Sequence, residues 1–92
     1  MIISLAEAKE YLRVDGTSED TTIETLLKSA QNICMDTARI DNESDFNSAG
    51  DVAKSSVLYA LSYLYEHREE ADHKDLTLTL RALLFGIRKQ VF

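Results

Sequence analysis

Three acidic residues stand at alternate positions, as they do at the start of a calcium-binding loop: Asp41, Glu43 and Asp45. Such a loop also needs a glycine at its sixth position and a bidentate glutamate at its twelfth. This chain has Phe46 and Val52 there. The sequence therefore predicts no calcium site.

Glu70 and His73 have the Glu-x-x-His spacing of di-iron bundles, and His67 lies one helical turn earlier. A di-iron site needs a second such pair and further inward-facing glutamates, which the sequence lacks. Cys34 falls on an apolar stripe, where a buried cysteine behaves as a small hydrophobe. We therefore expect no metal and no cofactor.

The three glycines, at positions 16, 50 and 86, are too scattered to form a phosphate-binding loop. No histidine is placed near Cys34 in the sequence to activate it. Without a phosphate loop, a metal set or a nucleophile pair, the sequence predicts that the protein is not an enzyme.

The chain has 92 residues and a mass of 10.4 kDa, which predicts one domain over residues 1–92. Its longest uncharged apolar run is Val57–Tyr65, far short of the roughly 20 residues that span a bilayer. No basic and apolar leader precedes Glu7, and a single cysteine fits a reducing compartment. We expect synthesis in the cytoplasm and no contact with a membrane.

Charge is unevenly distributed along the chain. Residues 1–51 hold eleven acids and four bases, and most of the acids lie between Asp15 and Asp51. The last twelve residues hold Arg81, Arg88 and Lys89 and no acid. The acidic part is either an ordinary solvated surface or a wall beside something anionic. A pI near 4.7 disfavours specific DNA binding, although an acidic protein can surround DNA without gripping it.

The sequence has no proline, and its apolar residues recur at helical spacing. Together these features predict an all-α fold, a small bundle of about four helices with two longer antiparallel central helices. The first helix runs from a capping box at Ser4 to about Arg13. A turn with Asp15 and Gly16 follows it. Apolar residues expected on its inner stripe are Leu5, Ala8, Tyr11 and Leu12.

A second helix is expected to begin between Ser18 and Thr21 and to bury one face. That face comprises Ile23, Leu26, Leu27, Ala30, Ile33, Cys34 and Thr37. The polar stretch Ile40–Gly50 is predicted to be a loop, which Phe46 attaches to the body.

Ser48 is expected to cap a third helix that runs to about Glu70, and Leu76 to about Ile87 form a fourth. The third helix is apolar on most sides, which is typical of a helix that is central or that faces another subunit. If its core face is Ala53, Val57, Leu61 and Leu64, then Tyr59 and Tyr63 are predicted to meet a neighbouring subunit. The alternative is that both tyrosines are core residues.

Several motifs in a fixed order resemble the small head-tail connector, or head-completion adaptor, proteins of tailed bacteriophages and prophages. The first runs from Leu5 to Arg13 as Leu-x-x-Ala-Lys-x-Tyr-Leu-Arg. The others are Asp20 with Ile23, then Leu64, Tyr65, Arg68 and Glu69, and last Leu83, Leu84 and Arg88. The likeness covers nearly the whole chain.

The resemblance implies a structural adaptor that is made in the bacterial host cytoplasm and located at the head-tail interface of the virion. About twelve copies would form a ring below the portal protein, extend the DNA channel and dock a stopper or tail-completion protein. Duplex DNA would pass through without specific binding. We expect Tyr59, Tyr63, Arg68 and Glu69 at the subunit interface, and Arg81, Arg88 and Lys89 to dock the portal or tail. Alternatives are a small helical protein-interaction module and a DNA-packaging accessory module.

Overall fold

The computed structural model of the protein describes residues 1–68 and 74–87, and all regular elements in these ranges are helical. The small all-α bundle is therefore confirmed. The alternating run at 76–80 is helix, since a lone strand would have no partner. The elements are α1 (Leu5–Leu12), α2 (Asp20–Ala38), α3 (Glu43–Asn47), α4 (Asp51–Glu66), α5 (Lys74–Leu83) and the 3-10 turn η1 (Phe85–Ile87).

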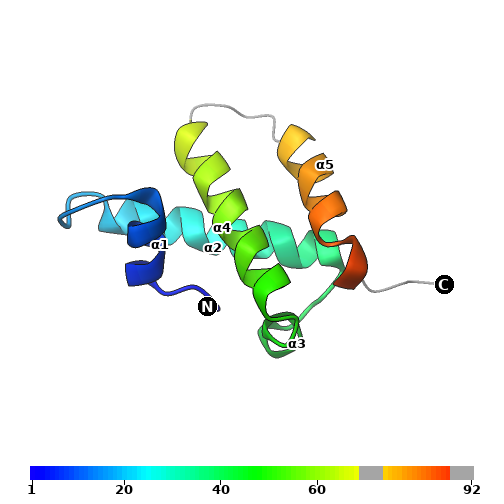
Figure 1. Ribbon diagram of the computed structural model, residues 1–92. Helices are drawn as coiled ribbons and strands as arrows, with labels where there is room; N and C mark the ends of the chain where they lie inside the picture. Colours follow the sequence, from blue (N-terminus) through cyan, green and yellow to red (C-terminus); the bar gives the residue numbers. More distant parts are fainter. Residues whose placement is uncertain (69–73, 88–92) are drawn as a thin grey trace.

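The two longest helices form the centre of the bundle. Figure 1 shows α4 running back across α2 at a steep angle, with α5 beside α4 and also packed on α2. α1 covers the N-terminal part of α2, and the short α3 lies below the start of α4. The molecule is elongated, with principal extents of 46 × 27 × 16 Å, and α1 and η1 lie toward opposite ends of it.

One apolar core joins the helices. The predicted core face of α4, comprising Ala53, Val57, Leu61 and Leu64, is buried as expected. Phe46 is completely buried, so it does attach its segment to the body. The remaining buried apolar residues are Ile3, Ala8, Ile23, Leu27, Ala30, Cys34, Ala38, Ile40, Ala60, Leu76, Leu80 and Leu84.

α1 begins with the predicted capping box. The Ser4 hydroxyl accepts a hydrogen bond from the Glu7 N–H at 3.1 Å, and Glu7 Oε1 accepts one from the Ser4 N–H at 3.2 Å. These bonds lower the pKa of Glu7. One expectation for this helix was wrong: Tyr11 is 50% exposed, because α1 is short and buries only Ala8 fully.

The predicted turn before α2 is confirmed. Gly16 has a φ of 82°, which a glycine adopts at little cost. Lys9 reaches across the turn, donates a hydrogen bond to the Gly16 carbonyl and forms an ion pair with Asp20 at 2.8 Å. The contact holds the end of α1 near the start of α2, which begins at Asp20, inside the expected range.

The segment predicted as a loop contains a short helix. Asn42 caps α3 by accepting a hydrogen bond from the Asp45 N–H at 2.8 Å, a common use of asparagine. The expectation that Ser48 caps α4 was wrong: Ser48 ends α3 instead. Gly50 precedes α4 with a φ of 65°, a backbone conformation that disfavours residues with a Cβ.

Candidate interaction surfaces

Tyr59 and Tyr63 differ in exposure although they lie one turn apart on α4. Tyr59 is 40% exposed and is therefore not an ordinary core residue. Tyr63 is partly buried against the core, and its ring stacks on His67 with centroids 4.2 Å apart. The Tyr63 carbonyl also contacts His67 Nδ1 at 2.9 Å. Of the two, Tyr59 therefore exposes more of its side chain to a partner.

A polar cluster joins the C-terminal end of α4 to the start of α2. The Tyr65 hydroxyl donates a hydrogen bond to Glu19 Oε2 at 2.6 Å, and Arg68 pairs with Glu19 Oε1 at 3.3 Å. The Arg68 guanidinium lies over the Tyr65 ring, 4.8 Å from its centroid. The hydrogen bond from Tyr65 lowers the pKa of Glu19, and the same bond raises the pKa of Tyr65.

This cluster gives Arg68, which was predicted at the subunit interface, an intramolecular partner. Glu69, predicted beside it, lies outside the described residues. The sequence reading missed the role of Glu19, because it is 46 residues from Tyr65 and no local pattern joins them. Arg68 therefore contributes to holding α4 on α2, whatever else it binds.

The last part of the described chain exposes large apolar side chains. Phe85 in η1 is 75% exposed, and Leu78 is 51% exposed on the side of α5 opposite the buried Leu76 and Leu80. Ala82 lies between them and is exposed. We call Leu78, Ala82 and Phe85 the α5 outer face; the sequence analysis did not single it out.

Arg81 is the described member of the basic group predicted to dock the portal or tail. It is exposed and lines a hollow of about 300 Å³ between α2 and α5, together with Asp36 and Thr77. Arg88 and Lys89 lie outside the described residues. The structure thus places Arg81 beside an acid of α2, and says nothing of the other two.

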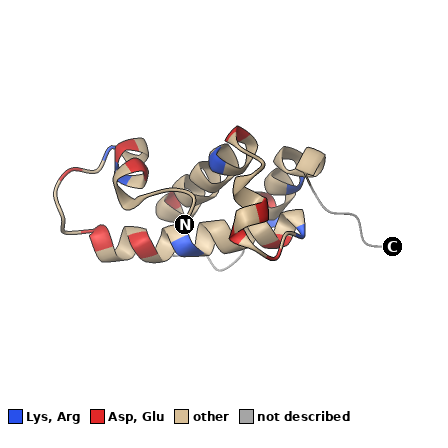
Figure 2. Cartoon of the chain, turned by 90° about the horizontal axis from the view of Figure 1, so that it is seen from below, with Lys and Arg blue, Asp and Glu red and all other residues tan. Residues whose placement is uncertain are grey.

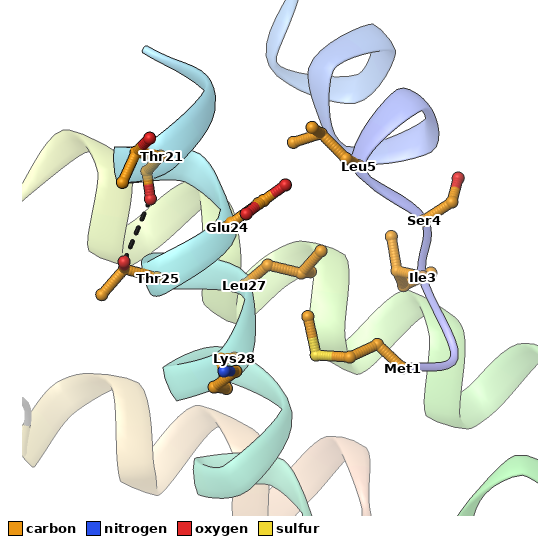
Figure 3. A pocket seen from close by; sticks show the side chains of 9 residues that line it. All are labelled: Met1, Ile3, Ser4, Leu5, Thr21, Glu24, Thr25, Leu27 and Lys28. Atoms are coloured by element: carbon orange, nitrogen blue, oxygen red, sulfur yellow. Dashed lines mark hydrogen bonds between the residues drawn. The ribbon is translucent and has the colours of Figure 1, made fainter.

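A groove lies between the N-terminal segment and the first half of α2 (Figure 3). Its volume is about 500 Å³. The buried side chains of Ile3 and Leu27 form its floor, and the exposed or partly exposed Met1 and Leu5 form apolar walls. Its polar lining residues are Ser4, Thr21, Glu24, Thr25 and Lys28. The groove can accept an apolar side chain and has charges beside it.

Acidic side chains are spread over the surface of the first half of the chain. Figure 2 shows acidic positions along α2 and around α3, with few basic ones between them. The exposed acids of residues 15–51 are Asp15, Glu24, Asp36, Asp41, Glu43, Asp45 and Asp51. Such a surface repels a polyanion and does not bind it tightly.

Cys34 is fully buried, and burial raises the pKa of its thiol to about 12. It is therefore an unreactive core residue, as predicted. In the part of the chain that the structure describes, no group of three or more His, Cys, Asp or Glu side chains is placed to hold a metal ion. Nor does any helix there have the length and apolar character needed to cross a bilayer.

Comparison with known proteins identifies a family. A family model described as Phage gp6-like head-tail connector protein matches residues 2–91. The matched range includes all the helices described above. No curated protein and no solved structure matches the chain.

Proposed function

This chain belongs to the phage gp6-like head-tail connector family, and from that membership we propose that its copies form a ring of about twelve below the portal. The protein is a structural component of the head-tail junction. In this proposal the ring extends the DNA channel and offers a platform for a stopper or tail-completion protein. The family match over residues 2–91 carries the proposal.

Two features of the structure support a role in assembly. Tyr59 of α4 and the α5 outer face expose large apolar side chains, which is typical of surfaces that contact other proteins. We propose Tyr59 and Tyr63, with Arg68 and Glu69, as part of the contact between subunits. We propose Arg81, Arg88 and Lys89 as the group that docks the portal or the tail.

The acidic surface supports passage of DNA without capture. Like charge on protein and duplex keeps the duplex mobile, because no cations hold its phosphates. We expect the free protein to bind duplex DNA with a Kd of about 10⁻⁴ M or weaker at physiological salt, in the range of non-specific binding. Sub-micromolar, sequence-selective binding in a fluorescence anisotropy titration would instead indicate a DNA-packaging factor.

The direct test is assembly with the portal. Purified protein and portal protein of the same phage are mixed, and native mass spectrometry and electron microscopy determine whether a ring of this chain attaches to the portal. A ring, alone or only on the portal, supports the proposal. A protein that stays monomeric or dimeric and does not bind the portal contradicts it.

A further inference from the structure

Two exposed apolar surfaces of this chain can complement each other. One is the groove between the N-terminal segment and α2, and the other is the α5 outer face. We propose that Leu78 and Phe85 of one copy insert into the groove of the next copy. This inference rests on the proposed ring and names the surfaces that build it.

The groove has a buried apolar floor and an exposed apolar edge that a protein partner can cover. Ile3 and Leu27 are each 1% exposed at its base, whereas Met1 is 50% exposed at its edge. Figure 3 shows Met1, Ile3 and Leu5 on one side of the gap and α2 on the other. An inserted apolar side chain would cover Met1 and Leu5, and burying that apolar surface favours association.

The α5 outer face is also apolar and exposed. Phe85 extends from η1 with three quarters of its surface exposed, and Leu78 is exposed two turns earlier. Aromatic anchors that fill a pocket on the partner commonly dominate the energy of an interface. The chain thus carries both an apolar anchor and an apolar pocket.

The two surfaces are different parts of the fold. Figure 1 shows α1 on one side of the bundle and η1 on the other, with the N-terminus between them. Contacts between two different surfaces of the same chain propagate from copy to copy and close into a ring when the rotation allows it. A single surface that met its own copy would instead give a closed dimer.

One pair of charges at the edges of the two surfaces is opposite in sign. Lys28 is exposed at the edge of the groove, and Asp75 is exposed one turn before Leu78 on α5. Among the residues that the structure describes, neither of these side chains forms an ion pair within the chain. With Leu78 in the groove, Asp75 can pair with Lys28 of the next copy, which selects this orientation of docking.

A disulfide cross-link tests the contact. Thr25→Cys places a thiol on the exposed edge of the groove, and Gly86→Cys places one beside Phe85, where an added Cβ meets no atom within 4 Å. A disulfide requires Cα atoms within roughly 7 Å, so a ladder forms only where the groove of one copy and η1 of the next lie that close together. The native Cys34 is buried and does not compete.

We expect the double variant, oxidised mildly, to form a ladder of dimers, trimers and higher species on a non-reducing gel. The control pair combines Gly86→Cys with Glu10→Cys, which is exposed on α1, and we expect several-fold less product from it. Dimers alone, or a ladder no stronger than the control, would overturn the inference. If rings form by native mass spectrometry without this ladder, the inference fails and the proposed function stands.

A charge exchange in the same cysteine background tests the orientation. Lys28→Asp or Asp75→Lys alone should reduce the ladder about tenfold, because like charges then face each other. The two changes together should restore it, which loss of folding cannot imitate. Loss in both single variants without recovery would contradict the pairing. An unchanged ladder in Phe85→Glu, accompanied by loss of portal binding, would assign the α5 outer face to the portal and overturn the contact.

Discussion

The hydroxyl of Tyr65 donates a 2.6 Å hydrogen bond to Oε2 of Glu19 and so joins the end of α4 to the residue that precedes α2. Arg68 pairs with the other oxygen of the same carboxylate at 3.3 Å. The carboxylate is thus bonded from two directions by side chains of the α4 end. Because α2 and α4 are the central helices, this cluster helps to fix how they cross.

Replacing Tyr65 with phenylalanine should lower the stability of the protein without changing its fold. The phenylalanine ring can still pack, but the Glu19 carboxylate loses the hydrogen bond that the Tyr65 hydroxyl donates. We expect a lower urea midpoint with unchanged helical circular dichroism. Tyr11→Phe, in an exposed residue of α1, is the matched control and should leave the midpoint unchanged. Equal midpoints for Tyr65→Phe and wild type would show that the bond contributes nothing.

The Glu19 cluster should also make stability depend on pH in the acidic range. The pKa of Glu19 is lowered in the folded protein from an ordinary value of 4.5, so the folded state binds the proton more weakly than the unfolded state. Its stabilisation is present above pH 4.5 and is lost as pH falls through the folded pKa. The difference in urea midpoint between wild type and Glu19→Gln should therefore be larger at pH 7 than at pH 3. A difference that does not depend on pH would refute this.

Phe46→Ala should be among the most damaging single changes. The side chain is fully buried and comes from the short helix α3, so its removal leaves a cavity and frees the segment between α2 and α4. Such truncations cost about 3–5 kcal/mol. A domain of this size has only about 5–14 kcal/mol in total. Denaturant unfolding measures the loss, and the neighbouring Asn47→Ala, exposed, should change stability little.

Cys34 should resist thiol reagents while the protein is folded. Burial raises its pKa to about 12, so almost no thiolate exists at pH 8, and the side chain is covered. We expect reaction with a chromogenic disulfide reagent only after addition of denaturant. In the variant Gly86→Cys, the new thiol should react at once and release one equivalent of the coloured thiolate, which shows that the reagent works. Rapid reaction of the native wild type would contradict the burial of this residue.

Tyr59→Arg should separate folding from assembly. Tyr59 is 40% exposed, so we expect the variant to keep its helical circular dichroism and cooperative melting but to lose the ring or the attachment to portal in native mass spectrometry. Tyr63→Arg should also lower the melting temperature, because Tyr63 packs on the core and stacks on His67. Asn32→Arg, exposed on α2, is the control. Full assembly of Tyr59→Arg would remove this residue from the interface.

Local signals in the sequence determined most of the helices. The capping box at Ser4, the turn at Gly16 and the apolar period from Ile23 to Cys34 each act within a few residues, and the structure confirms them. The short helix α3 was missed even though Asn42 and Asp45 have capping spacing. The polar composition of that stretch indicated a loop, and burial of Phe46 by the rest of the bundle stabilises the helix instead.

The surfaces could not be derived in the same way. An apolar stripe says which residues prefer burial, but not which ones the neighbouring helices actually cover. Tyr11 was expected to be buried and is exposed. No sequence pattern marked Phe85, which is the most exposed large apolar residue described. Composition and motif order determined the fold class and the family. Only the tertiary packing decided that Glu19 meets Tyr65, that an apolar groove forms beside the N-terminal segment and that Phe85 stays exposed. These features depend on how α4, the N-terminal segment and α5 pack on α2.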